Sequence, residues 1–131
     1  MSLITPPFKL AVIGAGGVGS LHIKNALNAT NIELVGVCEL DEGTAKAHLY
    51  GTTVPIVKTI KSLFEYEPDA VIIASDTSSH GKIAEELIEL GVPFLCEKPL
   101  ALNLPVARDI ANYAAKQNVY GAMAFNRRFH E

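Results

Sequence analysis

The chain has 131 residues, 49% of them apolar, which is enough for one packed domain. It has 14 acidic residues against 11 Lys and Arg, a net charge of −3, and no basic stripe or tail, so its charge does not favour nucleic-acid binding. No apolar run approaches the roughly 18 residues of a membrane span, and the N-terminus lacks the pattern of a secretory signal.

Short apolar runs alternate with segments of helical periodicity. The expected strands are residues 8–13, 32–38, 54–57, 70–74, 92–96 and 119–125. The expected helices are residues 17–28, a segment from a cap at Asp41 through Tyr50, a segment capped by Thr59, residues 78–90, and a segment capped by Asn103 with Pro105 in its first turn.

This alternation predicts the fold class. The strands are nearly continuous aliphatic runs, which is typical of strands buried on both faces of a parallel sheet. We therefore expect an α/β fold of three layers, a doubly wound parallel sheet with strand order 3-2-1-4-5-6. We expect one domain over residues 1–125. Residues 126–131 would then start a linker, with no closing element, to a C-terminal substrate and oligomerisation domain absent from this chain.

The first motif with chemical meaning directly follows the first strand. Gly14, Gly16 and Gly19 fit G-x-G-x-x-G at the start of a helix. The first glycine permits a tight turn, the second lets backbone approach a pyrophosphate, and the third lets helix and strand pack closely. Gly17 and Val18 complete the loop, whose N–H groups favour anions. A glycine-rich turn without a ligand is the alternative.

Glu39 lies 20 residues past Gly19, at the end of the second strand. An acid at this distance can accept hydrogen bonds from both hydroxyls of an adenine ribose and would repel a 2′-phosphate. The next residue is Leu40 rather than a cation, so the sequence favours NAD over NADP. Glu39 as a solvated strand end is the alternative, and Asp41 could share the ribose role.

Two further loops follow the fourth and fifth strands. Lys98, in Glu97-Lys98-Pro99, is placed where cofactor and substrate could meet, and could help to take a hydroxyl proton, although a surface lysine is the plainer interpretation. In the loop after the fourth strand, small polar residues such as Ser75 and Thr77 could touch a cofactor. His80 could contact a ligand or fix its loop by hydrogen bonds.

The two cysteines, Cys38 and Cys96, each end an apolar run, so they are interpreted as reduced core residues rather than a disulfide. No His/Cys pair has metal-ligand spacing, so no metal is expected. These features favour a cytoplasmic protein.

Together these pieces resemble the Gfo/Idh/MocA oxidoreductase family. The resemblance covers essentially the whole chain, and it rests on the stretches IGAGGVGSLH, ELVGVCELD, DAVIIASDTSSH, GVPFLCEKPLA and AFNRRFH. The Glu-Lys-Pro element is the most specific of them. The resemblance implies a Rossmann fold, an NAD cofactor, and a parent protein that oxidises or reduces a ring carbon of a sugar, inositol or related polyol and forms a homo-oligomer.

The resemblance also implies roles for single residues. Lys98 looks like the family's active-site lysine, and Glu97 like its partner at the cofactor ribose. Asn126 and Arg128 match a polar pair near the nicotinamide, while Glu131 stands where the family commonly has proline. Most substrate contacts, with an Asp and a His that is often the general base, belong to the family's second domain, so the chain alone is expected to bind cofactor without turnover.

Two other functions stay open. A dinucleotide sensor without catalysis is one, because the family includes a yeast galactose-pathway repressor; the presence of Lys98 argues mildly against it. An S-adenosylmethionine-dependent methyltransferase is the other, since it also uses a glycine-rich loop and an acid after the second strand. The third glycine and the Glu-Lys-Pro element argue against that interpretation.

Overall fold

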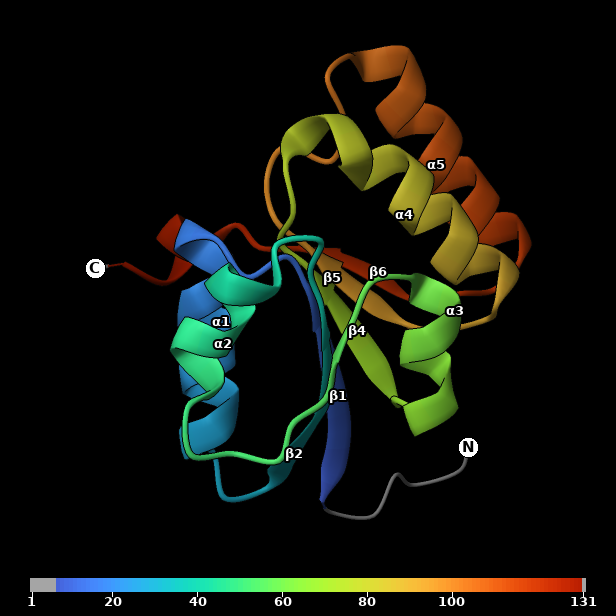
Figure 1. Cartoon of the computed structure of the whole chain (residues 1–131). Helices are drawn as coiled ribbons and strands as arrows, with labels where there is room; N and C mark the ends of the chain where they lie inside the picture. The colour runs from blue at the N-terminus through green and yellow to red at the C-terminus, as the bar shows by residue number, and fades with distance from the viewer. Residues whose placement is uncertain (1–6, 131) are drawn as a thin grey trace.

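The computed structural model describes residues 7–130, in which strands and helices alternate (Figure 1). The strands are β1 (Phe8–Ile13), β2 (Ile32–Cys38), β3 (Ile56–Val57), β4 (Ala70–Ile73), β5 (Phe94–Cys96) and β6 (Gly121–Met123). The helices are α1 (Gly17–Asn28), α2 (Glu42–Leu49), α3 (Ile60–Leu63), α4 (Thr77–Glu89) and α5 (Leu104–Lys116), with 3-10 turns at Phe64–Tyr66 and Asn126–Phe129.

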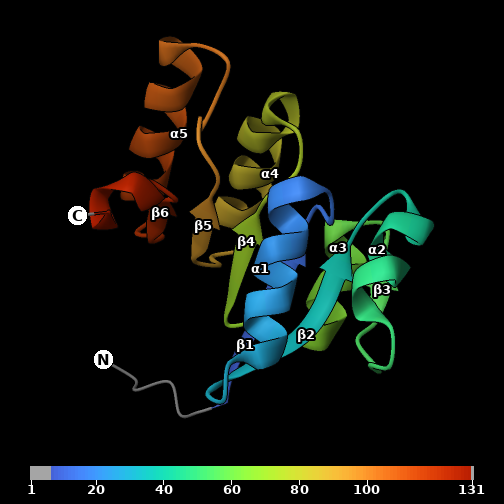
Figure 2. The ribbon, with the colours of Figure 1, turned by 90° about the vertical axis from the view of Figure 1, so that its left-hand side faces the viewer.

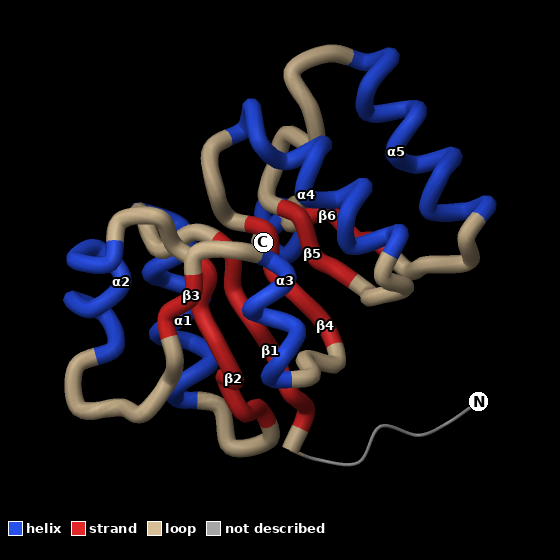
Figure 3. Tube along the Cα trace, turned by 45° about the vertical axis from the view of Figure 1, so that its right-hand side comes forward, coloured by secondary structure: helices blue, strands red, loops and turns tan. Residues whose placement is uncertain are grey.

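All the strands join one parallel sheet in the order β3-β2-β1-β4-β5-β6. This confirms the predicted doubly wound α/β fold and its strand order. The order reverses between β1 and β4, because the chain builds outward from β1 to β3 and then returns to start again at β4 (Figure 3). In such sheets ligands bind beyond the carboxyl ends of the strands, near the point of reversal.

Helices cover both faces of the sheet. Figures 1 and 2 show α1 and α2 on one face and α3, α4 and α5 on the other. Successive strand residues alternate between the faces, so Val12 packs in one buried cluster with Ile23 of α1, and Ile13 in the other with Leu87 of α4. The sheet is therefore buried on both sides, as the aliphatic strands predict.

Three of the predicted helix caps are confirmed. The side chains of Asp41, Thr59 and Asn103 each accept a hydrogen bond from the backbone N–H of the third residue of α2, α3 and α5 respectively. These caps fix where each helix begins. The loops that precede them are thereby held at the carboxyl-end edge of the sheet.

The strands β3, β5 and β6 are shorter than the expected residues 54–57, 92–96 and 119–125. Pro55 and Pro93 have no N–H to donate, so regular pairing starts after them, although their carbonyl oxygens still accept from the N–H groups of Val37 and Val71. Asn126–Phe129, at the start of the expected linker, form a 3-10 turn. Glu131 of the expected linker lies outside the described residues.

None of the helices in residues 7–130 is long and apolar enough to cross a membrane.

Candidate functional site

The loop between β1 and α1 needs glycine at the first and last motif positions. Gly14 has a φ of 95°, and a Cβ there would lie 2.6 Å from backbone atoms of Ala74 and Ser75. A Cβ on Gly19 would overlap the carbonyl oxygen of Gly14. The start of α1 therefore packs directly against the end of β1, which is the arrangement that the motif predicts.

Gly16 and Gly17 face open space instead. Apart from chain neighbours and the adjoining backbone of α1, no atom of residues 7–130 would lie within 4 Å of a Cβ on either glycine. Gly16 caps α1, and among residues 7–130 no side chain accepts a hydrogen bond from the N–H groups at this helix end. The first N–H groups of α1, including that of the exposed Val18, are thus available to a ligand, and the helix dipole favours an anion. An open helix N-terminus of this kind is typical of phosphate-binding sites.

Glu39, which directly follows β2, is tied to this loop. Its Oε2 accepts a hydrogen bond of 2.8 Å from the N–H of Ala15, and its Oε1 accepts one of 3.1 Å from the N–H of Asp41. The backbone N–H of Glu39 donates to the carbonyl of Val57. The carboxylate is therefore fixed beside the glycine loop, and each oxygen keeps a lone pair for a further donor.

A hollow of about 570 Å³ lies between the glycine loop and the ends of β2 and β4. The expected residues that line it are Gly14, Gly16, Glu39, Leu40 and Ser75. Two cations also line it, Lys58 from the end of β3 and Lys82 from α4. Hydrogen bonds from Thr44 lower the pKa of the nearby Asp41, with a smaller contribution from Lys58.

Polar side chains bind one another where β4 leads into α4. The hydroxyls of Ser75 and Ser79 lie 2.7 Å apart, Ser79 also donates to the carbonyl of Asp76, and Ser78 donates to the Asp76 carboxylate. Ser75 and Ser79 border the Glu39 hollow. Thr77 lines a different hollow, between α4 and residues 101–106.

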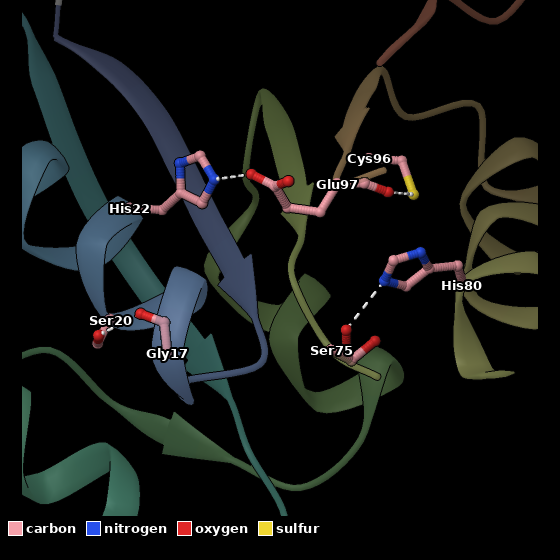
Figure 4. A network of polar contacts seen from close by, with 7 residues as sticks. All are labelled: Gly17, Ser20, His22, Ser75, His80, Cys96 and Glu97. Carbon is pink, nitrogen blue, oxygen red and sulfur yellow. Dashed lines mark hydrogen bonds and ion pairs between the residues drawn. The ribbon is translucent and has the colours of Figure 1, made fainter. Parts of the chain in front are cut away.

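His80 lies in the first turns of α4 (Figure 4) and is 1% exposed. Its Nε2 lies 2.9 Å from the carbonyl oxygen of Ser75, and its Nδ1 lies 2.8 Å from that of Pro99. Both partners are acceptors, so the ring donates to both only when each nitrogen bears a proton. Of its two predicted roles, this geometry favours the one in which His80 fixes its loop, because both nitrogens face protein carbonyls.

Glu97 begins the Glu97-Lys98-Pro99 turn after β5. Its backbone N–H donates to Ile73, and its Oε1 lies 2.8 Å from Nε2 of His22 on α1 (Figure 4). The two side chains are 17% and 21% exposed respectively. The turn is thus linked to α1 through Glu97 and to α4 through Pro99.

Lys98 is exposed, and the peptide bond between it and Pro99 is cis. A hollow of about 340 Å³ is lined by Lys98, Asn126 and Arg128 together with Phe125 and other neighbouring residues. The Arg128 guanidinium lies 5.0 Å from the centre of the Phe125 ring, a cation–π distance. The structure therefore brings Lys98 together with the polar pair that the resemblance assigns to the same region.

Sequence reasoning missed three residues. His22 lies three positions past the last motif glycine, and only the fold reveals its pairing with Glu97. Lys58 could have been found, because residues that follow parallel strands meet at one edge and Lys58 directly follows β3. Lys82 gives no such signal, since its position depends on how α4 packs.

Comparisons with known proteins agree with this geometry. A model of the oxidoreductase family with an NAD-binding Rossmann fold, Gfo/Idh/MocA, matches residues 8–125. Inositol 2-dehydrogenase 2 of Paenarthrobacter aurescens is 35% identical over 130 residues, and the match covers 94% of this chain and 39% of that enzyme. D-glucoside 3-dehydrogenase of Escherichia coli is 30% identical over 131 residues, and the match covers 98% of this chain and 37% of that enzyme. The crystal structure of GenD2 from gentamicin A biosynthesis, in complex with NAD, superposes with a TM-score of 0.80 and 25% identity over 94% of this chain and 35% of GenD2.

The fold and the glycine loop define an NAD-binding Rossmann domain of an oxidoreductase. The chain belongs to the Gfo/Idh/MocA family, whose members include inositol and sugar dehydrogenases. It spans about two fifths of the length of the curated relatives that it matches.

Proposed function

We propose that this chain binds NAD(H) along the carboxyl-end edge of its sheet and serves hydride transfer to or from a ring carbon of a sugar, an inositol or a related polyol. The observation that supports this most directly is the steric pattern of the glycine loop. Two glycines are needed for packing, whereas Gly16 and Gly17 leave open space at a helix N-terminus. Such a space suits the pyrophosphate of a dinucleotide.

On this proposal Glu39 and the adjoining hollow hold the adenosine half of the cofactor. The carboxylate is fixed by Ala15 and Asp41 and still has acceptor capacity for the two hydroxyls of a ribose. Leu40 offers apolar surface to the adenine, and Ser75 borders the same hollow. Glu97, Asn126 and Arg128 belong to the nicotinamide side, by resemblance and by their closeness to Lys98.

The preference for NAD(H) over NADP(H) rests on Glu39. Its charge would repel a 2′-phosphate at the ribose that it binds. Lys58 and Lys82 line the same hollow and oppose that repulsion, so the discrimination is expected to be moderate. GenD2, a structural relative, was crystallised with NAD.

Lys98 is the proposed catalytic residue. The cofactor, when bound, accepts or returns the hydride. When a hydroxyl-bearing carbon is oxidised, the hydroxyl proton must leave as well, and an amine beside the reacting oxygen can take it or stabilise the charge that develops. The turn holds Lys98 next to Asn126 and Arg128, which could orient polar substrate groups.

We further propose that this chain binds cofactor without turning over a sugar. The relatives are more than twice as long, and the resemblance assigns their general base and most substrate contacts to residues beyond those matched here. A cofactor sensor without catalysis is the second candidate. It shares the binding prediction but gives Lys98 no role.

The experiment is to follow the fluorescence of NADH as this chain is added, and then to test NAD⁺ reduction with inositols and aldoses. We expect NADH binding and no turnover. Absence of NADH binding would contradict the cofactor site. Sustained turnover would contradict the proposal that this chain binds cofactor without turning over a sugar. A Lys116→Met variant, an exposed change at the end of α5, serves as the control for binding, because its cofactor affinity should stay within about threefold of the original.

A further inference from the structure

His22 and Glu97 form a contact across the carboxyl-end edge of the sheet. His22 lies on α1, which follows β1, whereas Glu97 follows β5, and β4 separates these two strands. Their side chains nevertheless meet at 2.8 Å, from Nε2 to Oε1, and join residues 75 positions apart (Figure 4). The pair therefore spans the region where the strand order reverses.

The direction of this hydrogen bond follows from the chemistry of the partners. An ionised carboxylate only accepts, so Nε2 of His22 bears the proton and donates it. Such a charge-assisted bond is stronger than one between neutral groups. Partial burial of both side chains reduces competition from water.

The contact with His22 occupies one of the two carboxylate oxygens of Glu97. The backbone of Glu97 is fixed by its N–H bond to Ile73, and Oε1 is fixed by His22. Oε2 has no hydrogen-bond partner among residues 7–130. Glu97 is thus a carboxylate with one oxygen anchored and the other available at the edge where the glycine loop and Lys98 lie.

We propose that His22 is a positioning residue, which holds Glu97 so that Oε2 accepts a hydrogen bond from a hydroxyl of the ribose attached to the nicotinamide. This inference rests on the proposed NAD(H) site and names a further residue of it. A ribose diol is the suitable ligand chemistry, because a carboxylate fixed as an acceptor needs a hydroxyl donor and repels phosphate. His22 itself does not touch the cofactor.

A purely structural role is the competing explanation, since the same contact could simply join α1 to the turn after β5. The two roles differ in which ligands they affect. A structural role would weaken every ligand of the glycine loop alike. A positioning role would weaken only ligands that contain the second ribose.

The experiment therefore measures the binding of ADP, ADP-ribose and NADH to this chain by calorimetry. ADP lacks the second ribose, ADP-ribose contains it, and NADH adds the nicotinamide. The variants are His22→Leu, which removes the donor, and His22→Gln, whose amide N–H can replace Nε2–H. Asn25→Leu, at an exposed position on the same helix, is the matched control.

We expect His22→Leu to bind ADP-ribose and NADH about tenfold more weakly, as for the loss of a hydrogen bond to a charged group, while ADP binding changes by less than about twofold. His22→Gln should recover most of the lost affinity, and Asn25→Leu should bind all three ligands normally. Recovery by Gln also keeps the test valid if the Leu variant folds poorly.

Three results would overturn the inference. Unchanged ADP-ribose binding in His22→Leu would remove His22 from the site, and an equal loss for ADP would assign it a structural role. If the unaltered chain binds ADP-ribose no more tightly than ADP, Glu97 makes no ribose contact, although the adenosine site stands. If the unaltered chain binds none of the ligands, the proposed function itself fails.

Discussion

Glu39 combines two tasks in one side chain. It accepts a hydrogen bond from the N–H of Ala15 and so holds the glycine loop, and it lines the hollow assigned to adenosine. Its second oxygen accepts from Asp41. Because the carboxylate is held by backbone groups on both sides, its position does not depend on the ligand, and we expect a site that is largely formed before the cofactor arrives.

We predict that Glu39→Ala weakens NADH binding by about tenfold, because hydrogen bonds to a charged acceptor are lost. NADPH binding should weaken less or improve, since a 2′-phosphate no longer meets a negative charge while Lys58 and Lys82 remain. Titration of both cofactors checks this. Glu33→Ala, exposed on β2, is the control, and unchanged affinity of Glu39→Ala for both cofactors would remove Glu39 from the site.

The two thiols are buried and should make stability depend on alkaline pH. Burial, with a smaller contribution from Glu39, raises the pKa of Cys38 from 9.0 to about 11. Burial, with a smaller contribution from Glu97, raises the pKa of Cys96 from 9.0 to about 12. Well below pH 9 both thiols are neutral in the folded and unfolded chain. Above it the unfolded chain loses these protons first, so stability falls as the pH rises.

We predict that ionisation of the two thiols lowers the free energy of unfolding by about 2 kcal/mol between about pH 8 and about pH 10. This decrease adds to any pH dependence that remains when both cysteines are replaced. Urea denaturation at a series of pH values measures it. The double variant Cys38→Ala/Cys96→Ala, although less stable overall, should show a shallower slope. Equal slopes for the two proteins would contradict the assignment.

At the scale of elements, different glycines of the glycine loop serve helix packing and the proposed ligand binding. Gly19 allows α1 to approach β1, whereas Gly16 faces open space. The same methyl group should therefore have different consequences at the two positions. This separation makes it possible to test for a ligand without disturbing the fold.

We predict that Gly19→Ala lowers the free energy of unfolding by about 3 kcal/mol, because the new methyl overlaps the backbone of Gly14. Gly16→Ala should cost less than about 1 kcal/mol, the size of a helix-cap effect. It should nevertheless weaken NADH binding by more than about tenfold, since the methyl occupies the space proposed for the pyrophosphate. Denaturation and titration together check both variants. Normal NADH binding by Gly16→Ala would argue against a phosphate at this point.

His80 links α4 to two loops of the site. Its buried ring contacts the carbonyls of Ser75 and Pro99, which lie after β4 and β5. The turn that contains Lys98 is thus fixed on this side by a residue that the site hollows do not include. Loss of the ring would remove the hydrogen bonding between His80 and these carbonyl oxygens.

We predict that His80→Leu lowers the free energy of unfolding by about 3 kcal/mol, because the buried ring loses its hydrogen bonding to the partly buried carbonyls of Ser75 and Pro99. His48→Leu, an exposed change on α2, should stay within about 0.5 kcal/mol of the original chain. Urea denaturation of the two variants decides the matter. A similar small effect in both would show that the His80 contacts contribute little.

At the scale of the whole molecule, the fold could be predicted because the same strand-then-helix pattern repeats along the chain. Aliphatic strands alternate with amphipathic helices, and this pattern allows few topologies. The places of Glu39 and Lys98 followed as well, since residues after parallel strands meet at one edge. Strand lengths were less predictable, because prolines such as Pro55 remove single donors from the sheet.

The links between elements could not be predicted from the sequence. The contact of His22 with Glu97 depends on the angle at which α1 crosses the sheet. The burial of His80 likewise depends on how closely α4 approaches the turn after β5. Spacing along a chain encodes neither quantity, so both histidines acquire their meaning only from the fold.

The central claim is that the edge of the sheet formed by the glycine loop, Glu39 and Lys98 is an NAD(H) site. Calorimetric titration of this chain with NADH and, separately, with NADPH tests it most directly. We predict saturable binding of NADH, with affinity for NADPH lower by about tenfold. Binding of neither cofactor to the folded chain would contradict the claim.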